Sequence, residues 1–88
     1  MSTPPPGADV TIESFLFKPA SVTVPAGTTV TWKNLDQATH SIVSDKAGQF
    51  SSKNLLTGQS FSFTFTEPGS YPYHCGIHLA MHGTVTVT

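Results

Sequence analysis

Apolar and polar residues alternate with a period of two along most of this chain. Between Ser60 and Thr66, three phenylalanines share one face while serine and threonine occupy the other, which is typical of a strand with one buried face. The same alternation recurs at Val10–Ile12, Ser21–Val24, Thr28–Asn34, Tyr71–Cys75 and Thr84–Thr88. Glycines and prolines separate these segments and indicate turns. We therefore predict an all-β fold, an antiparallel β-sandwich of seven or eight strands with Greek-key connections.

Some stretches interrupt this pattern. After Ser14 the apolar positions change phase to Phe15 and Phe17, which predicts a bulge or a bend. His40–Ser44 is predicted to be a short strand that opens with the histidine. The segment 45–58 is polar and irregular, and a connection of this length is expected to cross from one sheet to the other. Gly83 is expected to permit a turn before the last strand.

The size and charge of the chain exclude several classes of protein. Eighty-eight residues suffice for one small domain. We expect residues 1–7, which include Pro4–Gly7, to form a disordered tail or linker stub, and residues 8–88 to form the domain. The single cysteine excludes an intrachain disulfide. A formal net charge of -1 argues against nucleic acid, because such binding requires a basic surface.

The N-terminal residues bear on the location of the protein. Met1–Thr3 lacks the basic start and apolar stretch of a signal peptide, and no apolar run is long enough to span a membrane. We expect a periplasmic or other extracytoplasmic monomer whose export signal or anchor is absent from this sequence. The alternative is a cytosolic protein with a ragged N-terminus.

Three potential metal ligands follow one another near the C-terminus. Cys75, His78 and Met81 stand at three-residue steps, and His40 lies at a predicted strand boundary upstream. Tyr71, Tyr73 and Cys75 share parity, so the thiol is expected to point inward. Thiolate, two imidazoles and a weak axial thioether form the ligand set of a blue-copper electron-transfer site. We therefore predict one type 1 copper ion bound by His40, Cys75, His78 and Met81.

Each of these residues also has an ordinary interpretation. A lone cysteine after an aromatic strand is usually a small core residue, and Met81 alone would be a core residue as well. His78 alone would be a loop histidine, and His40 could end a strand. The combination and its spacing favour copper. His74 has the opposite parity to Cys75, and His82 follows the axial methionine, so we predict that neither is a ligand.

The same residues could also serve other functions. A copper carrier or storage module that transfers no electrons is the main alternative, although such sites are usually open and rich in methionine or cysteine. A thiol hydrolase would need an oxyanion loop and an orienting third residue, and neither is evident. A thioether makes this a poor set for structural zinc. We expect no enzymatic activity.

The chain resembles the cupredoxins over about Val10–Val87. The resemblance includes the turn Val24–Gly27, the approach Pro68-Gly69-x-Tyr71-x-Tyr73 and the short Cys-x-x-His-x-x-Met loop, which is most similar to that of amicyanins. It implies that His40, Cys75 and His78 are the strong ligands and that Met81 is the axial one.

The resemblance also implies how electrons enter and leave. His78 would be the electron port, surrounded by an apolar patch at which redox partners dock weakly. The candidate patch residues are Ile77, Leu79, Ala80 and Ala38. One position departs from the family pattern, because many cupredoxins have asparagine after the upstream histidine and this chain has Ser41. We expect the Ser41 N–H to bond the Cys75 sulfur and its hydroxyl to replace part of the missing tie.

Overall fold

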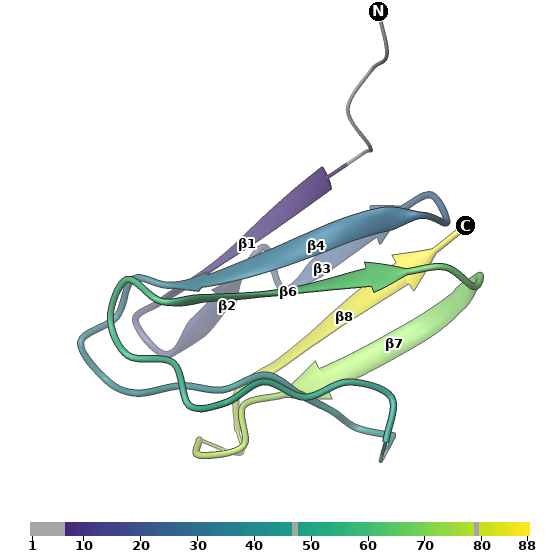
Figure 1. Cartoon of the computed structure of the whole chain (residues 1–88). Coiled ribbons are helices and arrows are strands. Elements are labelled where there is room, and N and C mark those ends of the chain that lie inside the picture. The colour runs from purple at the N-terminus through teal and green to yellow at the C-terminus, as the bar shows by residue number, and fades with distance from the viewer. Residues whose placement is uncertain (1–6, 47, 79) are drawn as a thin grey trace, which may run out of the picture.

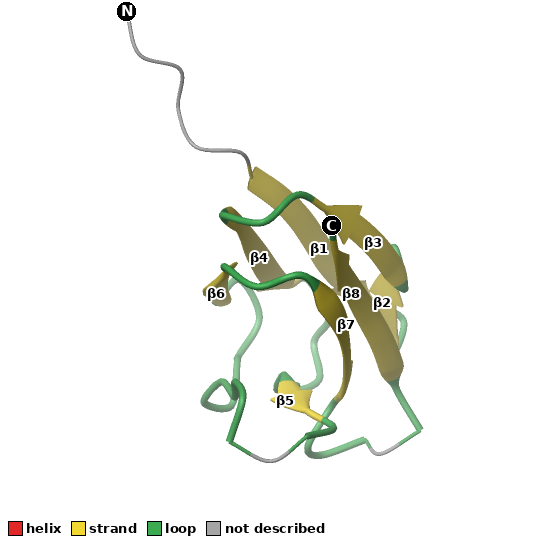
Figure 2. Ribbon diagram, turned by 90° about the vertical axis from the view of Figure 1, so that its right-hand side faces the viewer, coloured by secondary structure: helices red, strands yellow, loops and turns green. Residues whose placement is uncertain are grey.

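A computed structural model describes residues 7–46, 48–78 and 80–88. The described chain forms eight strands in two four-stranded sheets, ordered β2-β1-β4-β6 and β3-β8-β7-β5. The strands are β1 (Gly7–Glu13), β2 (Leu16–Lys18), β3 (Ser21–Val24), β4 (Thr28–Asn34), β5 (Val43–Ser44), β6 (Ser60–Phe65), β7 (Gly69–His74) and β8 (His82–Val87). The sheets form the two layers of a sandwich (Figures 1 and 2). The predicted β-sandwich is therefore confirmed.

The strand pairing is mixed, which corrects the expectation of purely antiparallel sheets. β1 pairs with β4 in parallel, and β3 pairs with β8 in parallel. The remaining pairs are antiparallel, including β4 with β6 and β7 with β8. Period-two alternation cannot distinguish the two directions, because successive side chains point to opposite faces in either case.

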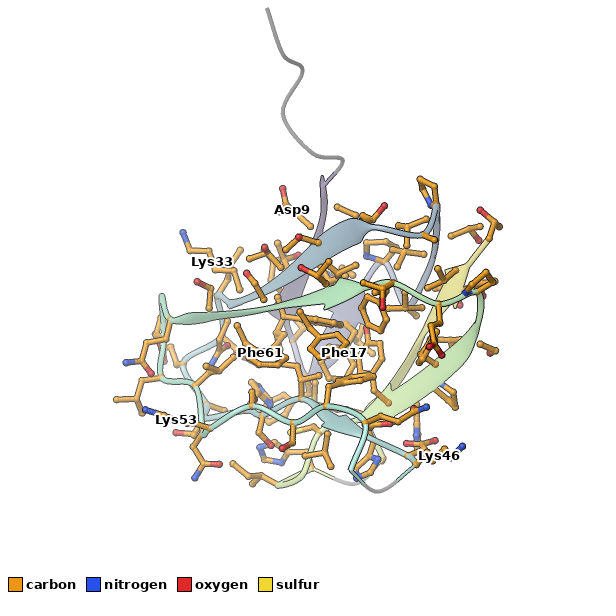
Figure 3. All side chains as sticks on the ribbon, turned by 45° about the vertical axis from the view of Figure 1, so that its right-hand side comes forward. Asp9, Phe17, Lys33, Lys46, Lys53 and Phe61 are labelled. Carbon is orange, nitrogen blue, oxygen red and sulfur yellow. The ribbon has the colours of Figure 1, made fainter. Side chains whose placement is uncertain are left out.

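Aromatic rings fill the space between the sheets. Trp32 is fully buried, and its ring meets those of Phe61 and Tyr73 at centroid distances of 5.7 and 5.4 Å. Figure 3 shows Phe17 and Phe61 between the layers, while the side chains of Lys33 and Lys53 lie at the periphery. The alternation of β6 is confirmed, since Phe61, Phe63 and Phe65 pack on the core. Burial of such large apolar side chains provides most of the stabilising free energy.

The change of phase after Ser14 is a tight hairpin rather than a bulge. Glu13 pairs with Leu16, so Ser14 and Phe15 are the whole loop between β1 and β2. Both have positive φ, at 53° and 59°. A two-residue turn requires positive φ at both positions if it is to match the twist of the flanking strands. Phe17 is buried, whereas Phe15 is 48% exposed. The turn thus carries a large aromatic ring at its tip.

The predicted strand His40–Ser44 is much shorter in the structure. Only Val43–Ser44 forms a strand, β5, and His40 makes an isolated bridge with Leu55 instead. The following connection runs from β5 in one sheet to β6 in the other, which confirms the predicted crossing. Phe50 and Leu55 anchor it in the core, while Leu56 is exposed.

Gly83 does not form a turn, which corrects the expectation. It lies inside β8, directly opposite Tyr73 of β7, and a Cβ atom at Gly83 would overlap the Tyr73 ring and hydroxyl. Only glycine lets the tyrosine cross the strand at this point. Burial raises the pKa of the Tyr73 hydroxyl, and among the described residues neither this hydroxyl nor the Trp32 indole N–H has a hydrogen-bond partner.

The first strand includes the last residue of the expected tail. β1 begins at Gly7, which had been assigned to the tail, and residues 1–6 lie outside the described part. In the described ranges no helix has the length and apolar character needed to cross a bilayer.

Candidate metal centre

The loop between β7 and β8 carries three of the four predicted ligands. Cys75 directly follows β7, and Met81 directly precedes β8. The Cys75 N–H donates to the Met81 carbonyl at 3.1 Å, and the Met81 N–H donates to the His78 carbonyl at 2.9 Å. The bond between Cys75 and Met81 thereby joins the two ends of the loop, where β7 ends and β8 begins. Cys75 is fully buried and Met81 is 5% exposed, while His78 is half-buried.

The fourth predicted ligand, His40, comes from the connection after β4. Its Nδ1 atom lies 3.7 Å from the Cys75 sulfur, and its ring lies 4.9 Å from the His78 ring between centroids. His40 is completely buried and is held by two backbone hydrogen bonds with Leu55, at 3.2 and 2.6 Å. In Figure 1 this connection and the β7–β8 loop lie at the same end of the sandwich. The fold therefore brings a thiol and two imidazoles together from segments far apart in the sequence.

Backbone N–H groups surround the cysteine sulfur. Ser41 and His78 each direct an N–H at it, at 3.4 and 3.5 Å. The Ser41 hydroxyl also accepts a hydrogen bond from the Gly76 N–H at 3.0 Å. Both contacts expected of Ser41 are present. Donors of this kind stabilise a thiolate, and they orient it toward the two rings.

Gly76 lies at a position where a side chain would come too close to its neighbours. A Cβ atom there would lie 2.9 Å from the Ser41 hydroxyl and 3.1 Å from a Val43 methyl group. Because those distances are below ordinary contact, a larger residue would push the ligand loop away from the His40 segment. Glycine thus permits the close approach that the hydrogen bond between Gly76 and Ser41 requires.

Two residues near the site were not singled out from the sequence. Asp36 Oδ2 lies 3.0 Å from His40 Nε2 and accepts the Phe15 N–H at 3.1 Å. The hydrogen bond to His40, followed by the one from Phe15, holds the pKa of Asp36 below its ordinary value. The Phe15 ring meets the His40 and His78 rings edge to face, at 5.4 and 5.0 Å. Asp36 could have been suspected from its place four residues before His40, but the pattern contains no comparable signal for Phe15.

The remaining histidines lie on the other side of β7. His74 Nδ1 contacts Asp45 Oδ1 at 2.6 Å, and the His74 ring faces that of His82, which is directly opposite on β8. Within the described residues, neither ring contacts the side chains of the four predicted ligands. This arrangement agrees with the parity argument that separated His74 from Cys75.

The candidate docking patch is only partly described. Ile77 is 45% exposed, Ala80 is exposed and Ala38 is half-buried, whereas Leu79 lies outside the described residues. Phe15 adds exposed apolar surface, at 48%. Phe15 belongs to the same surface, because its ring contacts that of His78.

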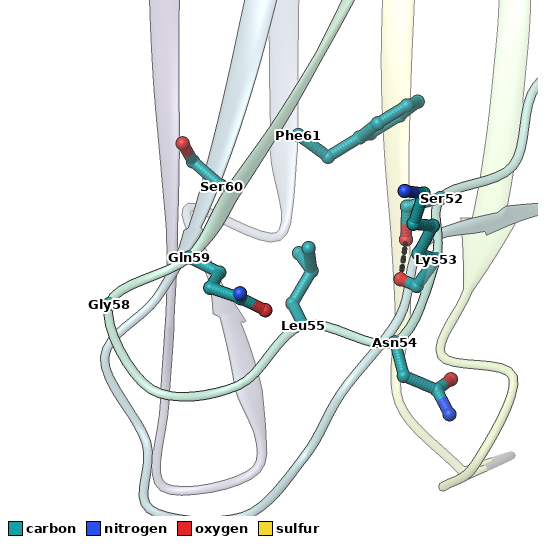
Figure 4. A pocket seen from close by; sticks show the side chains of 8 residues that line it. All are labelled: Ser52, Lys53, Asn54, Leu55, Gly58, Gln59, Ser60 and Phe61. Atoms are coloured by element: carbon teal, nitrogen blue, oxygen red, sulfur yellow. Dashed lines mark hydrogen bonds between the residues drawn. The ribbon is translucent and has the colours of Figure 1, made fainter.

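A hollow on the surface adjoins the His40 segment, because one of its lining residues is Leu55, which hydrogen-bonds the His40 backbone. It has a volume of about 440 Å³ and lies between the connection after β5 and the start of β6 (Figure 4). The residues that line it are Ser52, Lys53, Asn54, Leu55, Gly58, Gln59, Ser60 and Phe61. None of them is a predicted ligand, and in the close-up Leu55 and Phe61 present apolar side chains to it.

The chemistry of the assembled residues fits a copper ion. A buried free thiol with an imidazole nitrogen 3.7 Å away can share one metal ion with that nitrogen. Thiolate and imidazole donors together suit both oxidation states of copper. The half-buried His78 and the buried Met81 belong to the same short loop as Cys75, so they are the candidates for a third and a fourth donor.

Comparison with known proteins identifies a family and relatives of this chain. Residues 3–87 match the family model of the cupredoxin-like domain. The chain is 37% identical to plastocyanin from Scenedesmus fuscus, over 90% of this chain and 99% of that protein. It is 35% identical to amicyanin from Paracoccus denitrificans, over 89% of this chain but only 63% of that protein. The chain thus spans less than two thirds of the length of this amicyanin.

Solved structures of copper proteins also superpose on this chain. A purple cupredoxin from Nitrosopumilus maritimus superposes with a TM-score of 0.88 at 34% identity, covering 92% of this chain and 99% of that one. A copper-containing nitrite reductase from Thermus scotoductus has a TM-score of 0.87 at 32% identity. The match covers 99% of this chain but only 23% of the reductase.

Proposed function

Because the chain belongs to the cupredoxin-like family, we propose that it is a type 1 copper protein that carries single electrons between redox partners. The observation that best supports this is the contact of the buried Cys75 thiol with the His40 ring, which in turn lies against the His78 ring. We assign His40, Cys75 and His78 as strong ligands and Met81 as the axial one. A copper ion held there would supply a one-electron Cu(II)/Cu(I) couple.

The protein around this site keeps the donors in one arrangement. Burial of Cys75 and His40 excludes water from the sulfur and from the upstream ring. The Ser41 and His78 N–H groups fix the sulfur, and the hydrogen bond between Gly76 and Ser41 joins the two ligand segments. Rigid donors require little rearrangement when the charge changes by one, which favours rapid transfer in both directions.

Electrons would pass through His78, the half-buried ligand at the end of the molecule. Exposed apolar side chains near it, including Ile77 and Phe15, suit a partner that docks weakly and leaves quickly. Ala38, Leu79 and Ala80 are further candidates for this patch. The partners would be redox proteins, and the protein would act as a monomer in the periplasm or another extracytoplasmic compartment.

The alternative of a copper carrier finds no support in these contacts. A carrier must release its ion, and an open site rich in sulfur would assist release. Here both the thiol and the upstream histidine are buried. The resemblance to nitrite reductase covers only 23% of that chain, so it supports a shared domain rather than a shared reaction, and we propose no enzymatic activity.

Copper addition to the purified apoprotein tests this function. The expected product shows an intense thiolate-to-copper absorption band and a type 1 electron paramagnetic resonance signal at one copper per chain. The band should bleach with ascorbate and return with oxidant. Cys75→Ser should abolish it, whereas His74→Asn and His82→Asn, which alter histidines on the other side of β7, should leave it unchanged. Colourless binding that is insensitive to reductant would contradict the proposal.

A further inference from the structure

The Asp36 carboxylate connects two segments that meet at the candidate metal centre. One oxygen, Oδ2, lies 3.0 Å from His40 Nε2 and also accepts the Phe15 N–H at 3.1 Å. The other oxygen accepts the Gln37 N–H at 3.0 Å. The carboxylate therefore contacts both the buried histidine and the tip of the β1–β2 hairpin.

Asp36 is itself held in place on its backbone. Its N–H donates to Asn34 Oδ1 at 2.9 Å, and its carbonyl accepts the Thr57 hydroxyl at 2.6 Å. Asn34 is fully buried and donates to the carbonyls of Ala38 and Leu55. The Asp36 side chain is only 17% exposed. These bonds give the carboxylate a fixed position, unlike that of an ordinary surface aspartate.

The contact selects one tautomer of His40. An ionised carboxylate only accepts hydrogen bonds, so Nε2 carries the proton that is shared with Asp36. The lone pair is then on Nδ1, the atom that lies 3.7 Å from the Cys75 sulfur. A carboxylate on the remote nitrogen of a metal-binding histidine also makes that ligand more basic.

The same carboxylate positions an aromatic cover. By accepting the Phe15 N–H, Asp36 fixes the hairpin tip whose ring packs against both His40 and His78. Phe15 adopts a left-handed backbone conformation, with φ at 59°, which is unfavourable for a bulky residue. An anchored N–H group gives a physical reason why the turn is kept in this form.

From these contacts we infer that Asp36 is a positioning residue of the copper site. It fixes the tautomer of His40 and holds Phe15 over both histidines, and its negative charge favours Cu(II) and so lowers the reduction potential. The part that concerns potential rests on the proposed function. The part that concerns the His40 tautomer does not require copper.

Two substitutions separate the charge from the contact. Asp36→Asn removes the charge but keeps an oxygen acceptor of the same shape, and Asp36→Ala removes both. The matched control is Asp45→Asn, because Asp45 also hydrogen-bonds a histidine, His74, that is not an assigned ligand. All three variants lose the same formal charge, so a difference between them reports the position of the carboxylate.

The first measurement uses the copper-free protein. Nitrogen-15 NMR of the imidazole rings should show His40 as the Nε2–H tautomer in the native chain and in Asp45→Asn. In Asp36→Ala this preference should be lost or strongly reduced. An unchanged His40 tautomer in Asp36→Ala would overturn the inference even if copper binding proved correct.

The second measurement uses the copper-loaded protein. Asp36→Asn should lower the preference for Cu(II) over Cu(I) by about tenfold, an upward shift of about 59 mV for one electron. Asp36→Ala should shift the potential at least as far, and Asp45→Asn much less. Equal shifts in Asp36→Asn and Asp45→Asn would overturn the role in the potential. If the native protein bound no copper, the proposed function would fail, and the tautomer result would still decide whether Asp36 positions His40.

Discussion

The backbone N–H of Ser41 donates to the sulfur of Cys75 at 3.4 Å, although 34 residues separate them in the chain. Ser41 also accepts the Gly76 N–H through its hydroxyl at 3.0 Å. One residue thus bonds to two consecutive positions of the ligand loop. The contact joins the connection after β4 to the β7–β8 loop and holds the thiol beside His40.

Ser41→Ala should destabilise the copper-free protein by about 1 kcal/mol, because the substitution removes the hydrogen bond between the Gly76 N–H and the buried Ser41. Urea unfolding followed by fluorescence measures this change. Ser62→Ala is the control, since its hydroxyl bonds that of Thr31 on the exposed face of the sheet, and its expected effect is below about 0.5 kcal/mol. Equal effects for the two variants would contradict the role given to Ser41.

Gly83→Ala should destabilise the fold by about 2 to 4 kcal/mol, because the new methyl group overlaps the Tyr73 ring across the β7–β8 pair. Gly7→Ala is the matched control in another strand. Among the described residues, a Cβ atom there meets only the Thr29 carbonyl, at 3.7 Å, so little change is expected. In the double variant Gly83→Ala/Tyr73→Leu the cost should be less than the sum of the single costs, and simple additivity would contradict the predicted overlap.

Tyr73→Phe should leave the free energy of unfolding within about 0.5 kcal/mol or raise it slightly, since it removes a buried hydroxyl with no hydrogen-bond partner among the described residues. Thermal and urea unfolding of the copper-free protein measure the effect. Tyr71→Phe provides the comparison, because the Tyr71 hydroxyl donates to the Glu67 carbonyl at 2.7 Å. A larger loss in Tyr73→Phe than in Tyr71→Phe would show that the Tyr73 hydroxyl is satisfied in solution.

Phe15→Gly should be more stable than Phe15→Ala by about 1 kcal/mol. Both substitutions remove the ring, but only glycine adopts the observed φ of 59° without strain. Both variants should also lose bound copper to an external chelator faster than the native protein, because the ring that packs on His40 and His78 is gone. Equal stability of the two variants would indicate that the turn relaxes when the ring is removed.

Much of the fold followed from alternation, and the deviations have physical reasons. The three phenylalanines of β6 and the run from Tyr71 to Cys75 were predicted with the correct inward faces. The role of Gly83 was not predicted, because it depends on which residue lies opposite in the neighbouring strand. Period two describes one strand at a time and carries no information on register or direction.

The site was predicted to a similar extent. Spacing alone suggested that Cys75, His78 and Met81 share one loop, and the fold brings His40 to the same end. Asp36 and Phe15 act through side chains and backbone groups of irregular segments, where no period constrains orientation. The change of phase after Ser14 indicated a bulge or a bend, but the left-handed conformation of Phe15 is unusual for an aromatic residue and had no signal of its own.

The most direct test of electron transfer is a reductive titration of the copper-loaded protein with copper content measured before and after. We expect the thiolate-to-copper band to disappear after one electron per chain and to return fully on reoxidation, with the ion bound through repeated cycles. Release of copper on reduction, or a bound ion that accepts no electron, would contradict the account and support a copper carrier instead.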